Sequence, residues 1–506
     1  MTLSRRHLNQ ALLATLAIKL LLALVIPFSG DEAYFLIWGR HLDYGFYDHP
    51  PMVGWLLWAM LQISDAEWVL RLPVVLITSF IGYGLYRLLR DWDEQKALLI
   101  ALLYLVSPLN LLGVIITTDA GLVLFSFLTI ATLARAMRSG ARRDFIWAGV
   151  FFGLACLSKY FAALLGLAII AYWATTPAAR ARRNDFLALF AASLPFIALN
   201  VIWNMNHCWA NVMFNLFNRH DHAGFGLHKP LLYVALQIYL MTPLFALWLW
   251  QRRASLRGAW QDARFRLFGF AFLLPMAVFL PISLGKVIGW HWLLSFYPFF
   301  FALLAFWLDA ATLRRGLRFM AYYGGAHVVL LLLLVMMPMA AWQHTPWLRG
   351  AIVMFKPEAL LDQMRSYRSQ YVLATDGYSN SAILAYHAGE NVIVFGEGSS
   401  HARHDDLVTD FRALKGRDIA ILTKDSPQFE KYAPYFRSTE FDQITVYGTT
   451  FYLIHGLGFD YEAYREHVLR PIRERYYAIP AVLPMTGCYF CERYFPDASC
   501  RRGSKP

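Results

Sequence analysis

Residues 8–28 read LNQALLATLAIKLLLALVIPF, an almost uncharged run that is long enough to cross a bilayer as a helix. Similar apolar runs recur along the chain, which has 506 residues, 58% hydrophobic and 16% charged. A soluble domain carries about 25% charged residues. The composition therefore predicts a polytopic α-helical membrane protein with about eleven spans. Beside residues 8–28, the predicted spans are 68–88, 96–113, 119–136, 145–158, 161–176, 186–203, 230–250, 267–285, 291–312 and 319–341.

The formal net charge of +12 reflects topology and not a nucleic-acid partner. Lysine and arginine gather in the short loops at one set of span ends, beginning with Arg5 and Arg6, and are sparse at the other. The positive-inside rule then places the N-terminus in the cytoplasm, and an odd number of spans places the C-terminal region outside. Residues 26–30 make a poor cleavage site, so the first run is expected to remain as a span and not to be removed as a signal peptide.

Two domains are expected. Residues 1–341 form a transmembrane domain with a first external loop at 29–67, and residues 342–506 form a soluble, periplasmic α/β domain. Short β-like runs and helical segments alternate in this tail, as is typical of α/β architecture. The strands are expected at 371–376, 391–395 and 418–422, and the helices at 381–387 and 405–414.

The five cysteines fall into two groups. Cys156 and Cys208 stand in apolar surroundings and are expected to be packing residues. Cys488, Cys491 and Cys500 lie close together in the tail, where an oxidising compartment favours one disulfide with one thiol left over. A zinc site is the alternative, but it needs a fourth ligand that the spacing does not supply.

Residues 31–51, DEAYFLIWGRHLDYGFYDHPP, make the first external loop chemically rich. Asp31 and Glu32 follow the first span directly, at the level of the outer membrane face. A polar and aromatic cluster then ends at a rigid Pro-Pro. A loop that only joined two spans would not need this many acids, histidines and aromatic residues. The alternative reading is a solvated loop with an aromatic belt at the interface.

Further charged residues stand at the same outer side. Asp119 begins the fourth span, where a carboxylate can also serve as a helix N-cap. Lys159 sits in the break between two short spans, where a lysine at membrane depth usually has a functional partner, although snorkelling to the interface is the alternative. Lys286 and His291 lie at the outer end of the ninth and tenth spans, and Arg219 lies on the external loop 204–229.

The first loop resembles that of a family of integral-membrane glycosyltransferases with the GT-C fold. The resemblance rests on Asp31-Glu32-Ala33-Tyr34, on Trp38, and on the stretches 41–45 and 47–51. The family includes the aminoarabinose transferase that modifies lipid A, rhizobial lipopolysaccharide-core galacturonosyltransferases and bacterial relatives of protein O-mannosyltransferases. It implies a polyprenyl-phosphate (undecaprenyl-phosphate) sugar donor and an envelope glycolipid acceptor, handled at the bacterial inner membrane.

The resemblance also implies roles for single residues. Asp31 falls on the family's principal catalytic aspartate, Asp119 on its second acidic position, and Lys159 on the lysine of its Leu-(Thr/Ser)-Lys motif. The sequence departs from the aminoarabinose transferase in two places. Tyr34 stands where that enzyme has an arginine and His49 stands where it has a lysine, so aminoarabinose specificity is not implied and phosphate binding shifts to other cations.

We therefore expect an inverting glycosyl transfer with Asp31 as general base, because an acceptor hydroxyl is a weak nucleophile. Glu32 and Asp119 would orient acceptor and sugar. The expected donor-phosphate ligands are Lys159, Lys286, Arg219 and His49. The expected substrate-binding residues are Tyr34, Arg40, Tyr47, Asp48 and His291.

No cofactor is expected to be required, since the lipid phosphate is itself a competent leaving group. A divalent metal that bridges carboxylate and phosphate is the alternative. Two other functions stay open: a protein O-glycosyltransferase of the same fold, and a membrane solute transporter that uses the outer acidic cluster. The chain lacks the phosphate loop of nucleotide-binding proteins and the His-Glu-x-x-His zinc motif.

Overall fold

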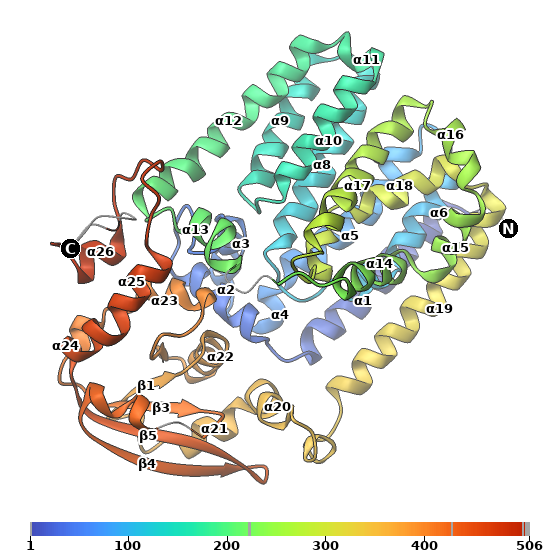
Figure 1. The fold of residues 1–506 in the computed structure, drawn as a ribbon. Helices are drawn as coiled ribbons and strands as arrows, with labels where there is room; N and C mark the ends of the chain where they lie inside the picture. Colours follow the sequence, from blue (N-terminus) through green and yellow to red (C-terminus); the bar gives the residue numbers. More distant parts are fainter. Residues whose placement is uncertain (1–2, 221–223, 427–428, 498–499, 501–506) are drawn as a thin grey trace. The chain divides into compact units, whose positions relative to one another are not determined.

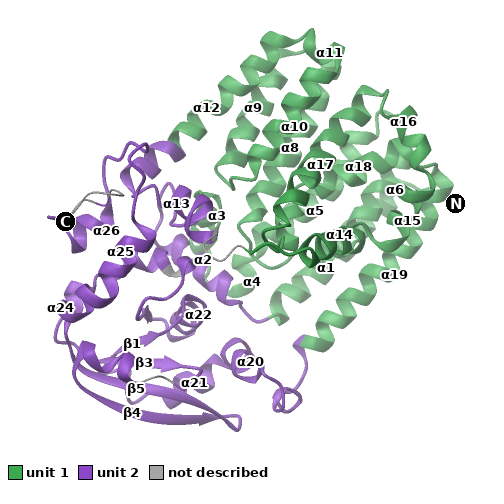
Figure 2. Cartoon of the chain, viewed as in Figure 1, with its two compact units in different colours: residues 1–26, 50–199, 222–334 green, residues 27–49, 200–221, 335–506 purple. Residues whose placement is uncertain are grey.

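The computed structural model describes residues 3–220, 224–426, 429–497 and 500, and it divides the chain into two compact units (Figure 1 and Figure 2). The first unit comprises residues 1–26, 50–199 and 222–334, and the second comprises 27–49, 200–221 and 335–506. The units interleave along the sequence, whereas the predicted division at residue 341 is linear. Part of the first external loop therefore belongs to the same compact unit as the tail.

The first unit is built from helices (Figure 1). Their bounds are α1 (Arg5–Val25), α3 (Met52–Leu61), α4 (Glu67–Leu70), α5 (Leu72–Leu89), α6 (Glu94–Leu105), α7 (Pro108–Leu111), α8 (Asp119–Ser139), α9 (Arg142–Cys156), α10 (Ala162–Thr175), α11 (Pro177–Arg180), α12 (Arg183–Asn206), α14 (His228–Met241), α15 (Pro243–Gln251), α16 (Leu256–Ala259), α17 (Ala263–Ile282), α18 (Tyr297–Trp307) and α19 (Ala310–Val335). The last residues of α12 and α19 belong to the second unit.

Within the described residues, six helical segments are long and apolar enough to cross a membrane. They are α1, the continuous segment Glu67–Leu89, α8, α12, α17 and α19. The bent pair α14 and α15 makes a seventh if it forms one span, and α3, α10 and α18 are shorter apolar helices. The predicted class, a polytopic helical membrane protein, is confirmed. The count of eleven spans stays a prediction.

Several predicted spans differ from the helices observed, the eighth and the last among them. Residues 230–250 are not one straight helix, because α14 and α15 meet at an angle of 99°. The bend falls at Thr242, which has a left-handed φ of 70°, followed by Pro243, which has no amide hydrogen to continue the ladder. The last span was expected at 319–341, but α19 runs from Ala310 to Val335.

The second unit carries a five-stranded sheet in the order β2-β1-β3-β5-β4. β2, β1 and β3 pair in parallel, and β3, β5 and β4 pair antiparallel. The strands are β1 (Val372–Thr375), β2 (Ile393–Val394), β3 (Ile419–Thr423), β4 (Phe436–Val446) and β5 (Thr449–Phe459). The helices are α2 (Gly30–Arg40), α13 (Ala210–Leu216), α20 (Leu348–Phe355), α21 (Pro357–Gln363), α22 (Tyr378–Ala388), α23 (Asp405–Val408), α24 (Tyr461–Tyr464), α25 (Arg470–Tyr476) and α26 (Tyr489–Tyr494).

The expected α/β pattern of the tail is confirmed by β1, β2, β3 and α22. The predicted helix 405–414 is wrong as one element, because α23 ends at Val408 and a separate 3-10 turn covers Phe411–Leu414. Asp410 interrupts the predicted helix because it caps the 3-10 turn, where its side chain accepts a hydrogen bond from the amide of Arg412. The hairpin β4–β5 was not predicted.

Four cysteines form two disulfides, Cys208–Cys488 and Cys491–Cys500, and Cys156 is free. The expectation that Cys208 only packs is therefore wrong, and no cysteine of the tail is left over as a thiol. Cys208 lies just beyond α12, so the first bond ties the segment 200–221 to the end of the tail across 280 residues. Both bonds lie in the second unit.

Breaking the long-range bond is expected to loosen the second unit. In Cys208→Ser, the midpoint of thermal unfolding should fall by an amount that corresponds to about 2–5 kcal/mol, because the bond closes a long loop of the unfolded chain. Cys156→Ser is the matched control and should leave the midpoint unchanged. Equal midpoints for wild type and Cys208→Ser in detergent, without reductant, would show that the bond does not hold this unit.

Candidate active site

Asp31 and Glu32 begin α2, but the helix uses them differently. Ser29 and Glu32 form a capping box, in which the amide of Ser29 donates to Glu32 Oε2 at 3.0 Å and the amide of Glu32 donates to Ser29 Oγ at 3.3 Å. Glu32 is fully buried, whereas Asp31 is exposed. Of the two acids, Asp31 therefore faces outward for chemistry, and Glu32 serves the start of the helix.

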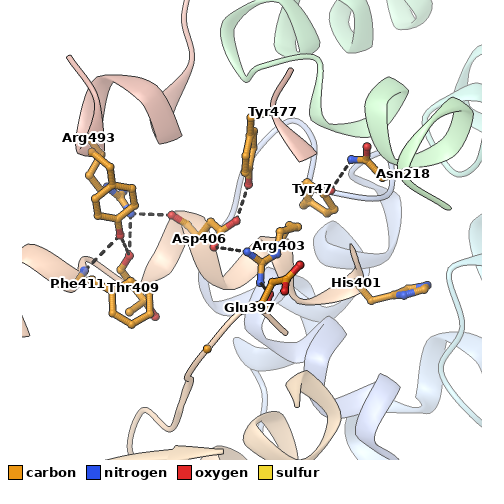
Figure 3. A network of polar contacts seen from close by, with 12 residues as sticks. Tyr47, Asn218, Glu397, His401, Arg403, Asp406, Thr409, Phe411, Tyr477 and Arg493 are labelled. Carbon is orange, nitrogen blue, oxygen red and sulfur yellow. Dashed lines mark hydrogen bonds and ion pairs between the residues drawn. The ribbon is translucent and has the colours of Figure 1, made fainter. Parts of the chain in front are cut away.

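Other residues of the first loop are held by side chains of residues 200–221, which belong to the same unit. The Nδ2 group of Asn211 donates to the carbonyl of Tyr47 at 3.2 Å, and that of Asn215 donates to the carbonyl of Asp48 at 3.0 Å. Asn218 Nδ2 donates to the Tyr47 hydroxyl at 3.0 Å (Figure 3). This ladder of asparagines fixes the loop, and the sequence analysis did not identify it.

Asp48 and His49 form an ion pair at 3.2 Å, between Asp48 Oδ2 and His49 Nδ1. Burial of Asp48 opposes its ionisation, but the charge and hydrogen bond of His49, with His401 and His404, hold the pKa of that carboxyl below its usual value. The predicted binding residue Asp48 is thus a buried carboxylate surrounded by imidazoles.

The tail contributes three residues that the sequence analysis missed: Tyr378, His401 and His404. Tyr378 donates its hydroxyl proton to Asp31 Oδ1 at 3.0 Å. The ring of His401 stacks on that of Tyr378, with 5.9 Å between centroids, and lies 5.0 Å from the ring of Phe214. No periodicity in the tail distinguishes these residues, so only the fold identifies them.

Arg219 joins the same cluster through an aromatic ring. Its guanidinium lies 5.7 Å from the centroid of Phe214, the ring that also contacts His401, and its charge helps to lower the pKa of His401 after burial. Tyr34 is almost fully buried, and its hydroxyl donates to the carbonyl of His401 at 2.8 Å. Arg40 is exposed at the last residue of α2.

A buried polar network holds the tail segment that carries these histidines (Figure 3). Arg403 lies 3.3 Å from Asp406 and donates to the carbonyl of Glu397 at 2.7 Å. Tyr477 donates to Asp406 Oδ2 at 2.7 Å, and Arg493 donates to the carbonyl of Asp406, also at 2.7 Å. The ion pair and these hydrogen bonds together stabilise residues 397–410.

The first unit holds a second group of predicted residues. Lys159 Nζ donates to Asp119 Oδ2 at 2.6 Å, and both side chains are buried. Asp119 is the first residue of α8, and Lys159 lies in the break between α9 and α10. The amide of Met52 donates to the carbonyl of Leu157 at 3.2 Å, which fixes the start of that break. Two residues that the sequence analysis treated separately thus form one ion pair.

Lys286 and His291 lie in the same unit as that pair. Lys159 lies 5.2 Å from the centroid of Phe161, whose ring is 5.2 Å from that of Trp292. Lys286 lies 5.6 Å from the centroid of Trp292. The two lysines therefore flank one aromatic pair, while the ring of His291 lies 6.1 Å from that of Trp292.

An apolar cavity of about 380 Å³ opens in the first unit. Asp119 lies in the chain between two of its lining residues, Thr117 and Ala120, and Trp290 belongs to the lining as well. Most of the other lining side chains are aliphatic or aromatic. The residues that flank Asp119 in the chain therefore line space that suits a hydrocarbon chain.

Among the described residues, one group of three or more His, Cys, Asp or Glu side chains has the spacing of a metal site, Cys488, Cys491 and Cys500. All three are bonded in disulfides.

His404 gives the second unit a pH-dependent stability. Burial lowers its pKa from 6.5 to about 3, although the charge of Asp48 raises it. His404 therefore binds a proton near pH 6.5 in the unfolded chain but stays neutral in the folded unit. Its contribution to the free energy of unfolding is complete above pH 6.5 and is lost as the pH falls toward 3. By about pH 5 the loss amounts to about 2 kcal/mol.

The test compares wild type with His404→Phe, which keeps the ring packing but does not titrate. The midpoint of thermal unfolding of wild type should fall further than that of the variant between about pH 7 and about pH 5. Burial also raises the pKa of Asp405 to about 7, which gives a slope of opposite sign, but this contribution is common to both proteins. Parallel curves would contradict the assignment.

Comparison with known proteins gives a family match, a curated relative and solved structures. A family described as dolichyl-phosphate-mannose-protein mannosyltransferase matches residues 48–203. Lipid A galacturonosyltransferase RgtD from Rhizobium johnstonii is 25% identical over 377 residues, which cover 72% of this chain and 75% of that protein. ArnT from Cupriavidus metallidurans bound to undecaprenyl phosphate superimposes with a TM-score of 0.64 at 14% identity, over 89% of this chain and 98% of ArnT. ArnT in the apo state gives a TM-score of 0.63.

Proposed function

We propose that this chain, whose resemblance to integral-membrane GT-C glycosyltransferases is confirmed by its relatives and its fold, transfers a sugar from a polyprenyl-phosphate donor to lipid A or to the lipopolysaccharide core. The observation that carries the proposal is the buried Lys159–Asp119 pair, whose aspartate is flanked in the chain by residues that line an apolar cavity. Buried ionisable pairs of this kind in membrane helices often mark the path of a charged substrate. A lipid phosphate has the matching chemistry, an anion joined to a hydrocarbon chain.

The donor is a polyprenyl phosphate sugar, of which undecaprenyl phosphate is the lipid part. In support, the matched family takes its name from a dolichyl-phosphate sugar, and a protein of the same fold has been solved with undecaprenyl phosphate. The apolar cavity of about 380 Å³ receives part of the lipid chain. Lys159 and Lys286 bind the phosphate and neutralise the charge that develops as it leaves.

The acceptor is a hydroxyl or a phosphate of lipid A or of the core oligosaccharide. The relative's name, lipid A galacturonosyltransferase, supports this class of acceptor. The sugar is a hexose or a pentose. The name of the matched family keeps a protein hydroxyl as the second candidate acceptor.

In the transfer, the acceptor oxygen attacks the anomeric carbon of the sugar while the bond from that carbon to the phosphate oxygen breaks. Asp31 removes the acceptor proton, and the lipid phosphate leaves with the bonding electron pair. Direct displacement inverts the anomeric centre. No metal is needed, because the lysines supply the positive charge at the leaving group.

The chemistry takes place on the periplasmic side of the inner membrane, with the N-terminus in the cytoplasm. The distribution of basic loop residues supports this orientation. The two disulfides of the second unit support it independently, because such bonds persist in an oxidising compartment.

The test uses the full chain in lipid nanodiscs with undecaprenyl-phosphate galacturonate or undecaprenyl-phosphate aminoarabinose as donor and purified lipid A as acceptor. Mass spectrometry should detect sugar-bearing lipid A with one of the two donors. Sugar found on an added envelope protein extract and never on lipid A would favour the protein acceptor. Failure of folded protein with both donors and both acceptors would contradict the proposal.

A further inference from the structure

The tail helix α22 lies directly against α2, the helix that carries Asp31. The helices approach so closely that a Cβ atom added to Gly30 would collide with the side chain of Ser379. The rings of Phe28 and Tyr386 pack with 4.8 Å between their centroids. Both helices belong to the second unit, so the first turn of α2 has a defined neighbour in the tail.

Tyr378, the first residue of α22, uses this contact to reach Asp31. Its hydroxyl donates to Asp31 Oδ1 at 3.0 Å. Its ring is held edge-on by Tyr34 at 5.0 Å and stacked on His401 at 5.9 Å with 19° between the planes. Tyr34 in turn is tied to the carbonyl of His401 at 2.8 Å. The tyrosine is therefore fixed from two sides.

The protonation state of Tyr378 makes it a donor only. Burial raises the pKa of its phenol, and the charge of Asp31 raises that pKa further. The phenol therefore keeps its proton throughout the range in which an enzyme works. Toward Asp31 it can donate a hydrogen bond but cannot take the proton that the carboxylate is to receive.

We infer that Tyr378 is a positioning residue for the transfer reaction, an inference that rests on the proposed role of Asp31 as base. By holding Oδ1, it sets the carboxylate plane and leaves Oδ2 to accept the acceptor's proton. Asp31 is exposed and its side chain would otherwise rotate freely, so orientation has to come from a partner. The soluble tail thus completes the catalytic apparatus.

The test measures the rate at which Tyr378→Phe releases undecaprenyl phosphate from the donor. This variant removes one oxygen atom and keeps the ring packing. The kcat should fall about tenfold with the KM for the donor unchanged, because an orientation effect acts on the transition state and not on donor binding. Tyr367→Phe is the matched control, since Tyr367 also donates to a carboxylate, Asp442, at 3.3 Å. It should behave as wild type.

Two further variants separate a loss of the Tyr378 hydrogen bond from a loss of helix packing and from a failure of the proposed base. Gly30→Ala disturbs the packing of α2 on α22 but keeps the hydroxyl, so it should lower the midpoint of thermal unfolding, which Tyr378→Phe should hardly change. If Tyr378→Phe instead matches Tyr367→Phe in kcat, or loses stability as Gly30→Ala does, the inference is overturned. Asp31→Asn is measured in the same experiment. Full activity of Asp31→Asn would overturn the proposed base itself. An inactive Asp31→Asn with a fully active Tyr378→Phe would overturn only the positioning role of Tyr378.

Discussion

Asp31→Asn lowers kcat for sugar transfer by about 10²–10⁴-fold while the protein stays folded, because the amide cannot take the acceptor's proton. Asp31 is exposed at the start of α2, and asparagine keeps an Oδ1 that can accept the hydrogen bond from Tyr378, so the exchange should cost little stability. The measurement is the initial rate of undecaprenyl phosphate release from the donor in nanodiscs, together with the midpoint of thermal unfolding, which should not change.

Asp43→Asn is the control for this prediction. Asp43 is another aspartate of the first loop, so its replacement by asparagine changes the loop charge by the same amount. Its carboxylate lies 3.7 Å from His207. Asp43→Asn should retain the wild-type rate within about twofold, in keeping with the small effect expected of a surface charge pair. Loss of activity in both variants would point to loop charge in general, and full activity in Asp31→Asn would remove Asp31 from the mechanism.

Lys159→Met is expected to damage both stability and donor binding. The side chains of Lys159 and Asp119 are buried at 2.6 Å from each other, and removal of one partner leaves an uncompensated charge. Such a loss costs about 3–5 kcal/mol. Native mass spectrometry should also show much weaker binding of undecaprenyl phosphate, since one of the two lysines that we propose to bind the phosphate is gone.

A double variant separates these two effects. Lys159→Met with Asp119→Leu removes both charges, which returns much of the stability but not the binding of undecaprenyl phosphate. Lys96→Met serves as the control, because Lys96 is a half-buried lysine of the same unit whose ammonium donates to the carbonyl of Ala305 at 3.0 Å. Binding that survives in the double variant would show that Lys159 only neutralises Asp119.

The sequence predicted the features that depend on local pattern. Apolar runs revealed the helical membrane fold, and the break at Lys159 was recognised because a charge interrupts two short runs. Asp31 and Asp119 were recognised because an acid directly at a span end is unusual. The pairing of Lys159 with Asp119 was not predicted, because the two residues are 40 positions apart and only the fold brings them together.

The parts that were missed depend on long-range contacts. Tyr378 is 347 positions from Asp31, and nothing near it in the sequence marks it as a partner. Cys208 was read as an apolar packing residue because its local surroundings are apolar, although its partner is Cys488. The 3-10 turn after Asp410 interrupts what the apolar spacing alone presents as one helix.

The most direct test of the account counts both products of one reaction. Wild-type protein is incubated with an undecaprenyl-phosphate sugar and lipid A, and mass spectrometry follows free undecaprenyl phosphate and sugar-bearing lipid A over time. The account predicts equal amounts of the two products, and no release when lipid A is left out. Release without lipid A, or no release from folded protein with either of the two donors named above, would contradict it.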